Sequence, residues 1–168
     1  MDIQISNESS ADITHIQRVT EQAFLHAPHT QHNEQLIVDA LRRSGALTTA
    51  QVAKVDDKII GHVAISPVSI SGGATGWFGL GPISVLPEYQ RQGVGSKLMK
   101  SSLAALQAMG AAGCVVLGDP DYYCRFGFKA VEGLVFPGAP AEYFQALSFN
   151  GSFPRGEVSY HQAFSVQG

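Results

Sequence analysis

The chain passes from a strand into a helix through the segment Leu86-Pro87-Glu88-Tyr89-Gln90-Arg91-Gln92-Gly93-Val94-Gly95-Ser96-Lys97-Leu98. Two closely spaced glycines, Gly93 and Gly95, stand just ahead of a long helical pattern. At a helix start the backbone N–H groups have no partner within the helix and the helix dipole adds partial positive charge, so a phosphate is stabilised there. Glycine lets a ligand approach the backbone and permits left-handed dihedral angles. The segment predicts an anion site, with an ordinary strand-to-helix turn as the alternative.

Two common phosphate-binding motifs do not fit this segment. A P-loop requires Ser or Thr directly after its lysine, and Lys97 is followed by leucine. The dinucleotide fingerprint GxGxxG requires a third glycine at that same leucine, and an early strand rather than one in mid-chain. What remains is Gln/Arg-x-x-Gly-x-Gly/Ala, filled by Gln90, Gly93 and Gly95. This pattern resembles the acetyl-CoA-binding motif of the GCN5-related N-acetyltransferases.

Composition favours one folded domain over residues 1–168. Hydrophobic residues make up 45% of the chain and charged residues 15%, which suits a single core and excludes a disordered acidic protein. The net charge of −3, with no Lys/Arg block, argues against a nucleic-acid partner. No secretory signal or membrane-spanning run is visible, so we expect a cytoplasmic protein without a membrane partner. Cys114 and Cys124 lack metal-ligand spacing, and no metal site is expected.

Hydrophobic periodicity predicts the element order β-α-α-β-β-β-α-β-α-β-β. The helices are expected over residues 13–24, around residues 36–41, over residues 94–109, and in a short turn for which Asp119 is the N-cap. The strands are expected at residues 3–6, 48–55, 58–66, 77–85, 112–117, 144–149 and 157–164. The unbroken apolar run at residues 112–117 is typical of a strand that is buried on both faces.

A second segment strengthens the family resemblance. Residues 119–128 resemble the family's Asn-x-x-Ala-x-x-Phe-Tyr-x-x-x-Gly-Phe segment, with Tyr123 four residues before Gly127. This motif is similar to that of the YhbS-like subgroup of predicted N-acetyltransferases, and so is the later segment Tyr160-His161-Gln162-Ala163-Phe164. The resemblance implies the acyl-CoA N-acyltransferase fold, an α/β class with a mixed, partly splayed central sheet flanked by helices. Asp119 stands where many relatives carry Asn, and its carboxylate can accept from a pantetheine amide but cannot donate.

The resemblance also implies how acetyl-CoA, as the acetyl donor, is held. The pyrophosphate is expected on the turn, at backbone amides of Arg91, Gln92, Gly93, Val94, Gly95 and Ser96, with Gln90 opening the motif. Family members splay the strand that ends at Val85 away from residues 112–117, which frees the backbone of Ile83 and Val85 for the thioester and the pantetheine. The amide near Ile83 is then an oxyanion donor. Both side chains are expected to be ordinary core residues.

The resemblance places the general acid at Tyr123. A phenol stays protonated at neutral pH and can donate to the departing sulfur. The alternative is a packed aromatic residue, a role that we assign to Tyr122. Some relatives carry a glutamate base on the strand, at the position of Gly79. Glu34 is therefore the first candidate, as a base acting through water or as a contact to the substrate ammonium, with a solvated helix carboxylate as the alternative.

Two histidines remain as further candidates for the base. Imidazole titrates near neutrality, so His62 and His32 can serve, although a hydrogen-bonded structural histidine is the simpler interpretation of each. Cys124 raises the alternative of an acetyl-cysteine intermediate, which we disfavour because no nearby residue would lower the pKa of its thiol.

The sequence thus predicts an acetyl-CoA-dependent N-acetyltransferase that acts on a primary amine by direct attack in a ternary complex. The acceptor is a small-molecule or peptide amine that the sequence does not specify. The competing hypothesis is a non-catalytic acyl-CoA-binding or regulatory module of the same fold. Both a monomer and a homodimer are compatible with the sequence, since C-terminal strands can pair across a dimer.

Overall fold

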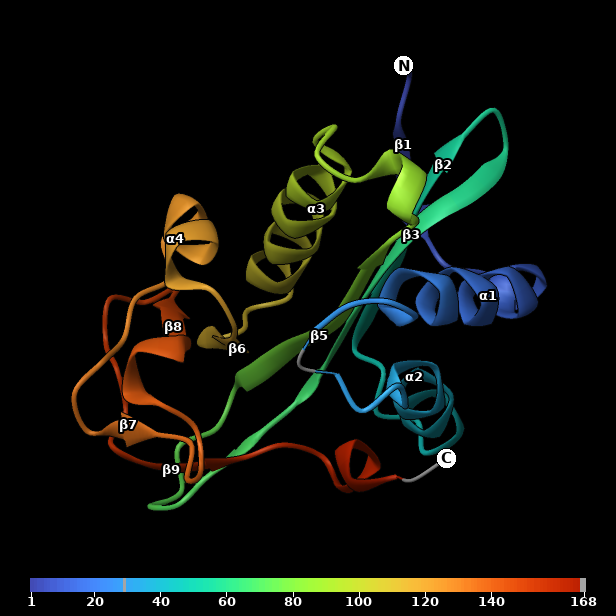
Figure 1. The fold of residues 1–168 in the computed structure, drawn as a ribbon. Helices are drawn as coiled ribbons and strands as arrows, with labels where there is room; N and C mark the ends of the chain where they lie inside the picture. Colours follow the sequence, from blue (N-terminus) through green and yellow to red (C-terminus); the bar gives the residue numbers. More distant parts are fainter. Residues whose placement is uncertain (29, 167–168) are drawn as a thin grey trace.

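The protein is built around a six-stranded sheet with helices on both faces (Figure 1). The computed structural model describes residues 1–28 and 30–166. The strand order is β1-β2-β3-β5-β6-β8. These strands are β1 (Gln4–Asn7), β2 (Thr49–Val55), β3 (Lys58–Pro67), β5 (Trp77–Val85), β6 (Gly113–Leu117) and β8 (Phe144–Ser148). All neighbouring pairs are antiparallel except β5 and β6, which run parallel.

Helices α1 (Ile13–Phe24) and α2 (Glu34–Arg43) cover one face of the sheet, and α3 (Val94–Ala108) covers the other (Figure 1). The short helix α4 (Pro120–Tyr123) follows β6. Short 3₁₀ segments complete the chain: η1 (Ser10–Asp12), η2 (Pro87–Tyr89), η3 (Cys124–Phe126), η4 (Ala141–Tyr143) and η5 (Gln162–Ser165). No helix in the described part of the chain has both the length and the apolar character needed to cross a bilayer.

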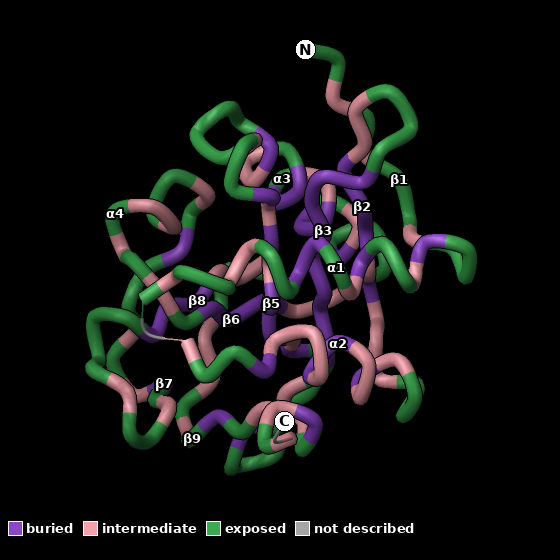
Figure 2. Tube along the Cα trace, turned by 45° about the vertical axis from the view of Figure 1, so that its right-hand side comes forward, coloured by how far each residue is buried: buried purple, intermediate pink, exposed green. Residues whose placement is uncertain are grey.

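The main core lies between the sheet and its helices, where the tube of Figure 2 is coloured as buried. On the α3 side, Leu98 and Leu106 are fully buried against Val63 and Ile65 of β3. A fully buried side chain of this size contributes about 1.5–3 kcal/mol relative to an exposed one. Gly61 lets α3 approach closely, because a Cβ there would lie 3.1 Å from Cδ1 of Leu98. The alternation of apolar residues that predicted these elements therefore also builds the core.

The C-terminal part differs from the expected strand over residues 157–164. Only β9 (Gly156–Ser159) is extended, and it joins β4 (Ser69–Ile70) and β7 (Leu134–Val135) in a separate three-stranded sheet. The chain then turns into η5, where Nδ1 of His161 accepts a hydrogen bond from the Ala163 amide at 3.0 Å. This histidine cap and the packing of Ala163 on α2 override the strand-like alternation of the sequence. The expected order of the other main elements is confirmed.

Candidate active site

The turn before α3 holds two residues in the left-handed conformation. Arg91 has a φ of 63° and Gly93, the N-cap of α3, has a φ of 86°. Left-handed residues within a turn rotate successive N–H groups toward one side, which forms an anion-binding concavity. The first intrahelical bond runs from the Lys97 amide to the Gly93 carbonyl at 3.1 Å, so the amides before Lys97 have no partner within the helix. The turn therefore has the geometry of an anion site.

A cleft of about 640 Å³ opens beside this turn. We call it the α3 cleft, and its lining is Ile83, Val85, Tyr89, Gln90, Arg91, Gly93, Gly95, Ser96, Tyr122 and Arg125. It is narrow at Gly95, where a Cβ would lie 3.0 Å from the Tyr122 hydroxyl. Two guanidinium groups, those of Arg91 and Arg125, add positive charge to the partial charge of the helix start. The α3 cleft thus combines an anion site with an apolar wall on β5.

Most of the residues expected at the cofactor line this cleft, and three do not. Val94, the first residue of α3, is buried, and the side chain of Gln92 donates to the Glu88 carbonyl at 3.0 Å. Asp119 is the N-cap of α4, as expected, and accepts from the Asp121 amide at 2.9 Å. The roles that the sequence assigned to the amides of Gln92 and Val94, and to the free oxygen of Asp119, stay predictions.

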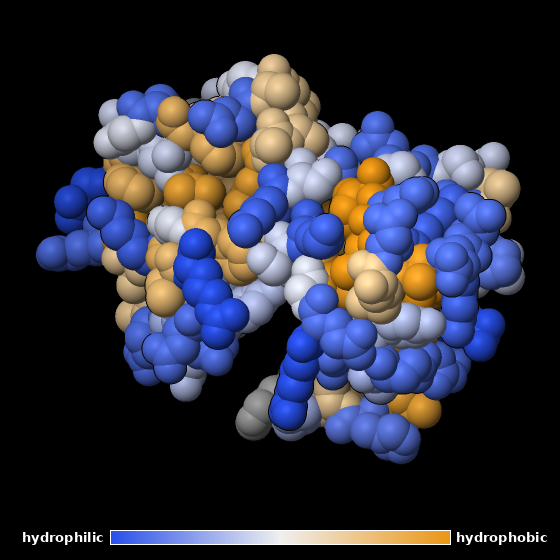
Figure 3. All heavy atoms as spheres, turned by 90° about the horizontal axis from the view of Figure 1, so that it is seen from above, coloured by the Kyte–Doolittle hydropathy of each residue, from blue (hydrophilic) through white to orange (hydrophobic). Residues whose placement is uncertain are grey.

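Strands β5 and β6 diverge next to the α3 cleft. They pair over three positions only, of which Gly79 with Val115 is the last. Beyond it β5 stays paired with β3 and β6 with β8, so residues 80–85 and 116–117 do not pair with each other. We call this opening the fork. In the space-filling view from above, a notch that is open to one side lies between two lobes of the molecule (Figure 3). The expected splay of the sheet is therefore present.

The fork exposes alternate backbone groups of β5. The Leu86 amide donates to the Ile60 carbonyl of β3 at 2.8 Å. Because backbone groups alternate in direction along a strand, those of Ile83 and Val85 point the other way, into the fork. The Val85 carbonyl accepts a hydrogen bond from the side chain of Gln90 at 3.0 Å. A ligand that uses this carbonyl must share it with Gln90 or displace that side chain.

Two adjacent tyrosines on α4 have different surroundings. Tyr122 lines the α3 cleft, whereas Tyr123 packs on the backbone of Gly118, where a Cβ would lie 2.6 Å from its ring. Burial, followed by the charges of Tyr122 and Asp119, raises the pKa of Tyr123 to about 12, so its phenol is protonated at neutral pH. The sequence assigned Tyr122 to packing, and Arg125 was missed. Tyr122 and Arg125 are three positions apart and therefore lie on one helical face, and this spacing could have indicated from the sequence that both face the cleft.

These features agree with what comparisons with known proteins find. A model of the acetyltransferase (GNAT) domain matches residues 47–130, which is half of the chain. The chain belongs to the GNAT acetyltransferase family. The matched residues run from just before β2 to just after Gly127, so they include the glycine turn, the fork and Tyr123. The family resemblance and the fold class predicted from the sequence are both confirmed.

Several GNAT proteins are similar to this chain in sequence or structure. The uncharacterized N-acetyltransferase YhbS of Escherichia coli K12 is 39% identical over 108 residues, or 64% of this chain, and the match spans only 65% of that relative's length. A GNAT family acetyltransferase from Brucella melitensis, solved in complex with acetyl-CoA, is 47% identical with a TM-score of 0.87, covering 97% of this chain and 98% of that chain. E. coli YhbS, solved in complex with CoA, is 33% identical with a TM-score of 0.86, covering 99% and 93%.

In this GNAT chain Glu34 lies at the start of α2 and is not among the residues that line the α3 cleft. Its Oε2 accepts a hydrogen bond from the hydroxyl of Thr30. Its Oε1 is buried and has no hydrogen-bond partner among the described residues. A buried carboxylate oxygen without a partner is costly, so such an atom commonly marks a place for water or a ligand. No described contact joins Glu34 to Tyr123, and the role of Glu34 as base or ammonium contact stays a prediction.

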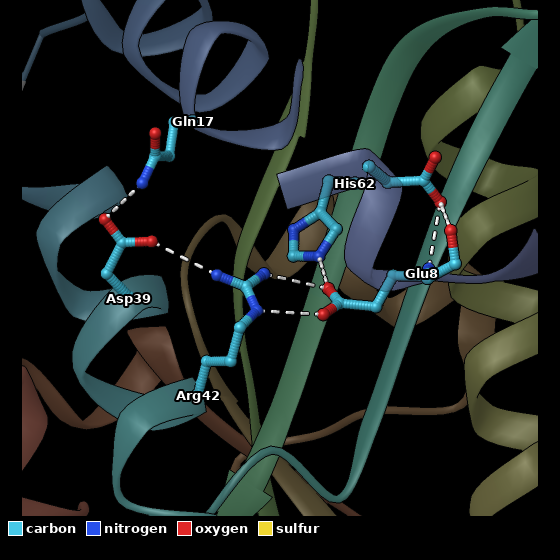
Figure 4. A network of polar contacts seen from close by, with 7 residues as sticks. Glu8, Gln17, Asp39, Arg42 and His62 are labelled. Carbon is cyan, nitrogen blue, oxygen red and sulfur yellow. Dashed lines mark hydrogen bonds and ion pairs between the residues drawn. The ribbon is translucent and has the colours of Figure 1, made fainter. Parts of the chain in front are cut away.

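The histidine candidate on β3 belongs to a structural network instead (Figure 4). His62 is fully buried, and its Nε2 lies 2.9 Å from Oε1 of Glu8. A carboxylate only accepts, so His62 donates from Nε2. Arg42 of α2 binds both oxygens of Glu8, at 3.0 and 3.1 Å, and also contacts Asp39, which accepts from Gln17 of α1. The network ties β3 to α2 and α1, which supports the structural interpretation of His62.

The charge of Glu8 makes this network dependent on pH. Burial alone would raise the pKa of Glu8, but the hydrogen bonds and charges of His62 and Arg42 outweigh burial and lower the pKa from 4.5 to about 2. A lowered pKa in the folded state stabilises the fold above the unfolded value, and this stabilisation is lost as pH falls from 4.5 toward 2.

Replacing Glu8→Gln keeps the shape of the side chain and removes its charge. We expect a loss of about 3 kcal/mol in the free energy of unfolding at pH 7, from the pKa shift of Glu8. The difference between wild type and variant should shrink at pH 3. Urea unfolding at pH 7, 5 and 3 measures it, with Asp39→Asn as the control for a more exposed ion pair, worth at most about 1 kcal/mol. A difference that is equal at pH 7 and pH 3 would contradict this account.

Proposed function

We propose that this protein is an acetyl-CoA-dependent N-acetyltransferase that moves the acetyl group to a primary amine by direct attack in a ternary complex. The observation that carries the proposal is the position of the glycine turn beside the fork. An anion site and a row of unpaired strand backbone lie within one cleft, which is what a long donor with a phosphate end and a thioester end requires. The acetyl-CoA and CoA bound to the two similar crystal structures support this choice of donor.

The turn would hold the pyrophosphate of the donor. Its left-handed residues aim the backbone N–H groups of residues 91–96 at the ligand, and the guanidinium groups of Arg91 and Arg125 add charge that favours phosphate. From there the pantetheine would run along β5 toward the fork. The Val85 carbonyl and the free oxygen of Asp119 are acceptors for its amide groups.

The thioester would lie at the fork, with its carbonyl oxygen near the Ile83 amide. A backbone N–H at that point stabilises the negative charge that develops on the oxygen, a contact worth about 3–4 kcal/mol of barrier in other acyl-transfer enzymes. The amine nitrogen bonds to the carbonyl carbon and gives up a proton, with Glu34 as the candidate base acting through water. The carbon–sulfur bond then breaks, its electron pair stays on sulfur, and Tyr123 protonates the thiolate.

The alternative is a non-catalytic acyl-CoA-binding or regulatory module. It is favoured by Gly79, because β5 carries no carboxylate where some relatives of the family place their base. It is disfavoured by Tyr123, whose buried and protonated phenol a binding module would not need.

The proposed acceptor is a small-molecule or peptide amine, and the oligomeric state, monomer or homodimer, can be measured on the same preparation.

The pyrophosphate assignment is tested at Gly95. Replacing Gly95→Val places a branched side chain against the Tyr122 hydroxyl within the α3 cleft, so we expect the dissociation constant for CoA to rise about ten-fold or more. Isothermal titration calorimetry measures it. Ala104→Val, at an exposed site further along α3, controls for the cost of branching in a helix. Unchanged CoA affinity in a folded Gly95→Val protein would show that the pyrophosphate lies elsewhere.

The chemical step is tested at Tyr123. The variant Tyr123→Phe keeps the ring and loses the proton donor, so amine-dependent thiol release should fall about 100-fold while CoA affinity stays unchanged. Thiol release is followed with a panel of primary amines, against a blank without amine because Cys124 is an exposed thiol. Tyr143→Phe, at an exposed tyrosine that does not line the α3 cleft, is the matched control. Tight CoA binding by the wild type without amine-dependent release would instead support the binding module.

A further inference from the structure

The ring of Tyr160 fills the space beside Gly79 on β5. A Cβ built on Gly79 would lie 2.5 Å from Cε1 and 2.9 Å from Cδ1 of Tyr160, distances that real Cβ atoms do not show. The same Cβ would lie 3.0 Å from Cγ1 of Val68. Position 79 therefore carries no side chain because a residue 81 positions later in the chain supplies one there. Gly79 and the ring of Tyr160 therefore pack together as one unit of the structure, with the ring in the space that a side chain at position 79 would need.

This unit lies at the base of the fork. Gly79 belongs to the last residue pair that β5 makes with β6. Ile83 and Val85 face the α3 cleft, whereas Tyr160 contacts Phe164, which packs with η5 against α2 on the other face of the sheet. Tyr160 thus reaches the fork from the side opposite to the proposed donor site. With the donor in the α3 cleft, the opposite side of the fork is the side left for the amine.

The ring of Tyr160 is held firmly. Phe136 meets it edge to face at a centroid distance of 5.1 Å, and Phe164 lies at the same distance on a tilted ring plane. On either side along the chain, β9 pairs with β4 and His161 caps η5. Aromatic contacts of this kind fix orientation as well as position. The hydroxyl therefore points in one direction rather than sampling many.

The hydroxyl of Tyr160 is not used by the fold. No hydrogen bond joins it to another residue in the described part of the chain, and it is not among the buried polar atoms that lack a partner, so it is accessible to solvent or a ligand. Burial, followed by the charges of Cys114 and Tyr123, raises the pKa of Tyr160 well above its usual value. The phenol of Tyr160 therefore stays protonated at neutral pH.

We propose that the hydroxyl of Tyr160 contacts the acceptor amine, in the place that a side chain on Gly79 would otherwise take. This inference rests on the proposed function. The phenol oxygen accepts a hydrogen bond from an N–H of the amine and so aims the nitrogen lone pair at the thioester carbon. It does not remove the proton, which leaves by the separate base. Tyr160 thus acts on the acceptor and Tyr123 on the leaving sulfur, with the thioester between them.

The variant Tyr160→Phe tests this inference, because it keeps every ring contact and loses only the hydroxyl. We expect kcat/KM for the best amine of the panel to fall about ten-fold or more, the effect of losing one well-placed hydrogen bond. The dissociation constant for acetyl-CoA and the midpoint of thermal unfolding should match those of wild type. A tyrosine that serves only to pack its ring would leave both the unfolding midpoint and the kinetic constants for the amine unchanged in this variant. Tyr143→Phe again serves as the control.

The outcomes separate this inference from the proposed function. If Tyr160→Phe turned over the amine as fast as wild type does, the inference would be overturned and the acetyltransferase proposal would stay intact. A Tyr160→Phe protein with weakened acetyl-CoA binding and unchanged kcat/KM for the amine would also overturn it, since the hydroxyl would then act on the donor. A wild-type protein that turns over no amine in the panel would overturn the proposed function and, with it, the role of Tyr160.

Discussion

After Gly79, β5 gives up its pairing with β6 and keeps only its pairing with β3, and the α3 cleft lies beside that divergence. Backbone groups without partners are costly in a folded protein, so a sheet opens in this way only when something else holds both sides. On one side β3 pairs with β5 along most of its length and α3 packs beneath it. On the other, β8 pairs with all of β6. The opening is thus a fixed feature of the fold, framed by regular structure.

The glycines of the molecule serve two different purposes around the fork. Gly93 provides a backbone angle that side chains resist, and so shapes the anion site. Gly61 and Gly79 have ordinary backbone angles and provide space instead, the first for α3 and the second for Tyr160. At Gly61 and Gly79 the missing Cβ lets two segments that are distant in sequence come into contact. Helix α3, whose start forms the anion site, and Tyr160 on the opposite side of the sheet are both positioned in this way.

Much of the fold could be predicted because local sequence patterns identify most of its helices and strands. Periodicity and turn residues define the elements up to β6 except the two-residue strand β4, and the glycine turn carries its own anion-site geometry. The strand expected at residues 157–164 was wrong from position 160 onward, because alternation of Tyr, Gln and Phe does not reveal a histidine cap or a docking surface on α2. Tyr122 was assigned to packing because adjacent residues on a short helix differ only by which side faces the cleft. The contact between Tyr160 and Gly79 depends on sheet register, which no local pattern contains.

The hydrogen bond from the Gln90 side chain keeps the Val85 carbonyl paired when no ligand is bound. An edge with unpaired carbonyls and amides is a template on which another chain can add a strand, and natural proteins protect such edges. Gln90 comes from the same turn that forms the anion site, and it covers one of these carbonyls while the fork is open. When a ligand amide replaces it, one donor is exchanged for another, so the net gain in free energy at that oxygen is small. The side chain of Gln90 therefore reduces the number of unpaired backbone groups on the β5 edge when no ligand is bound.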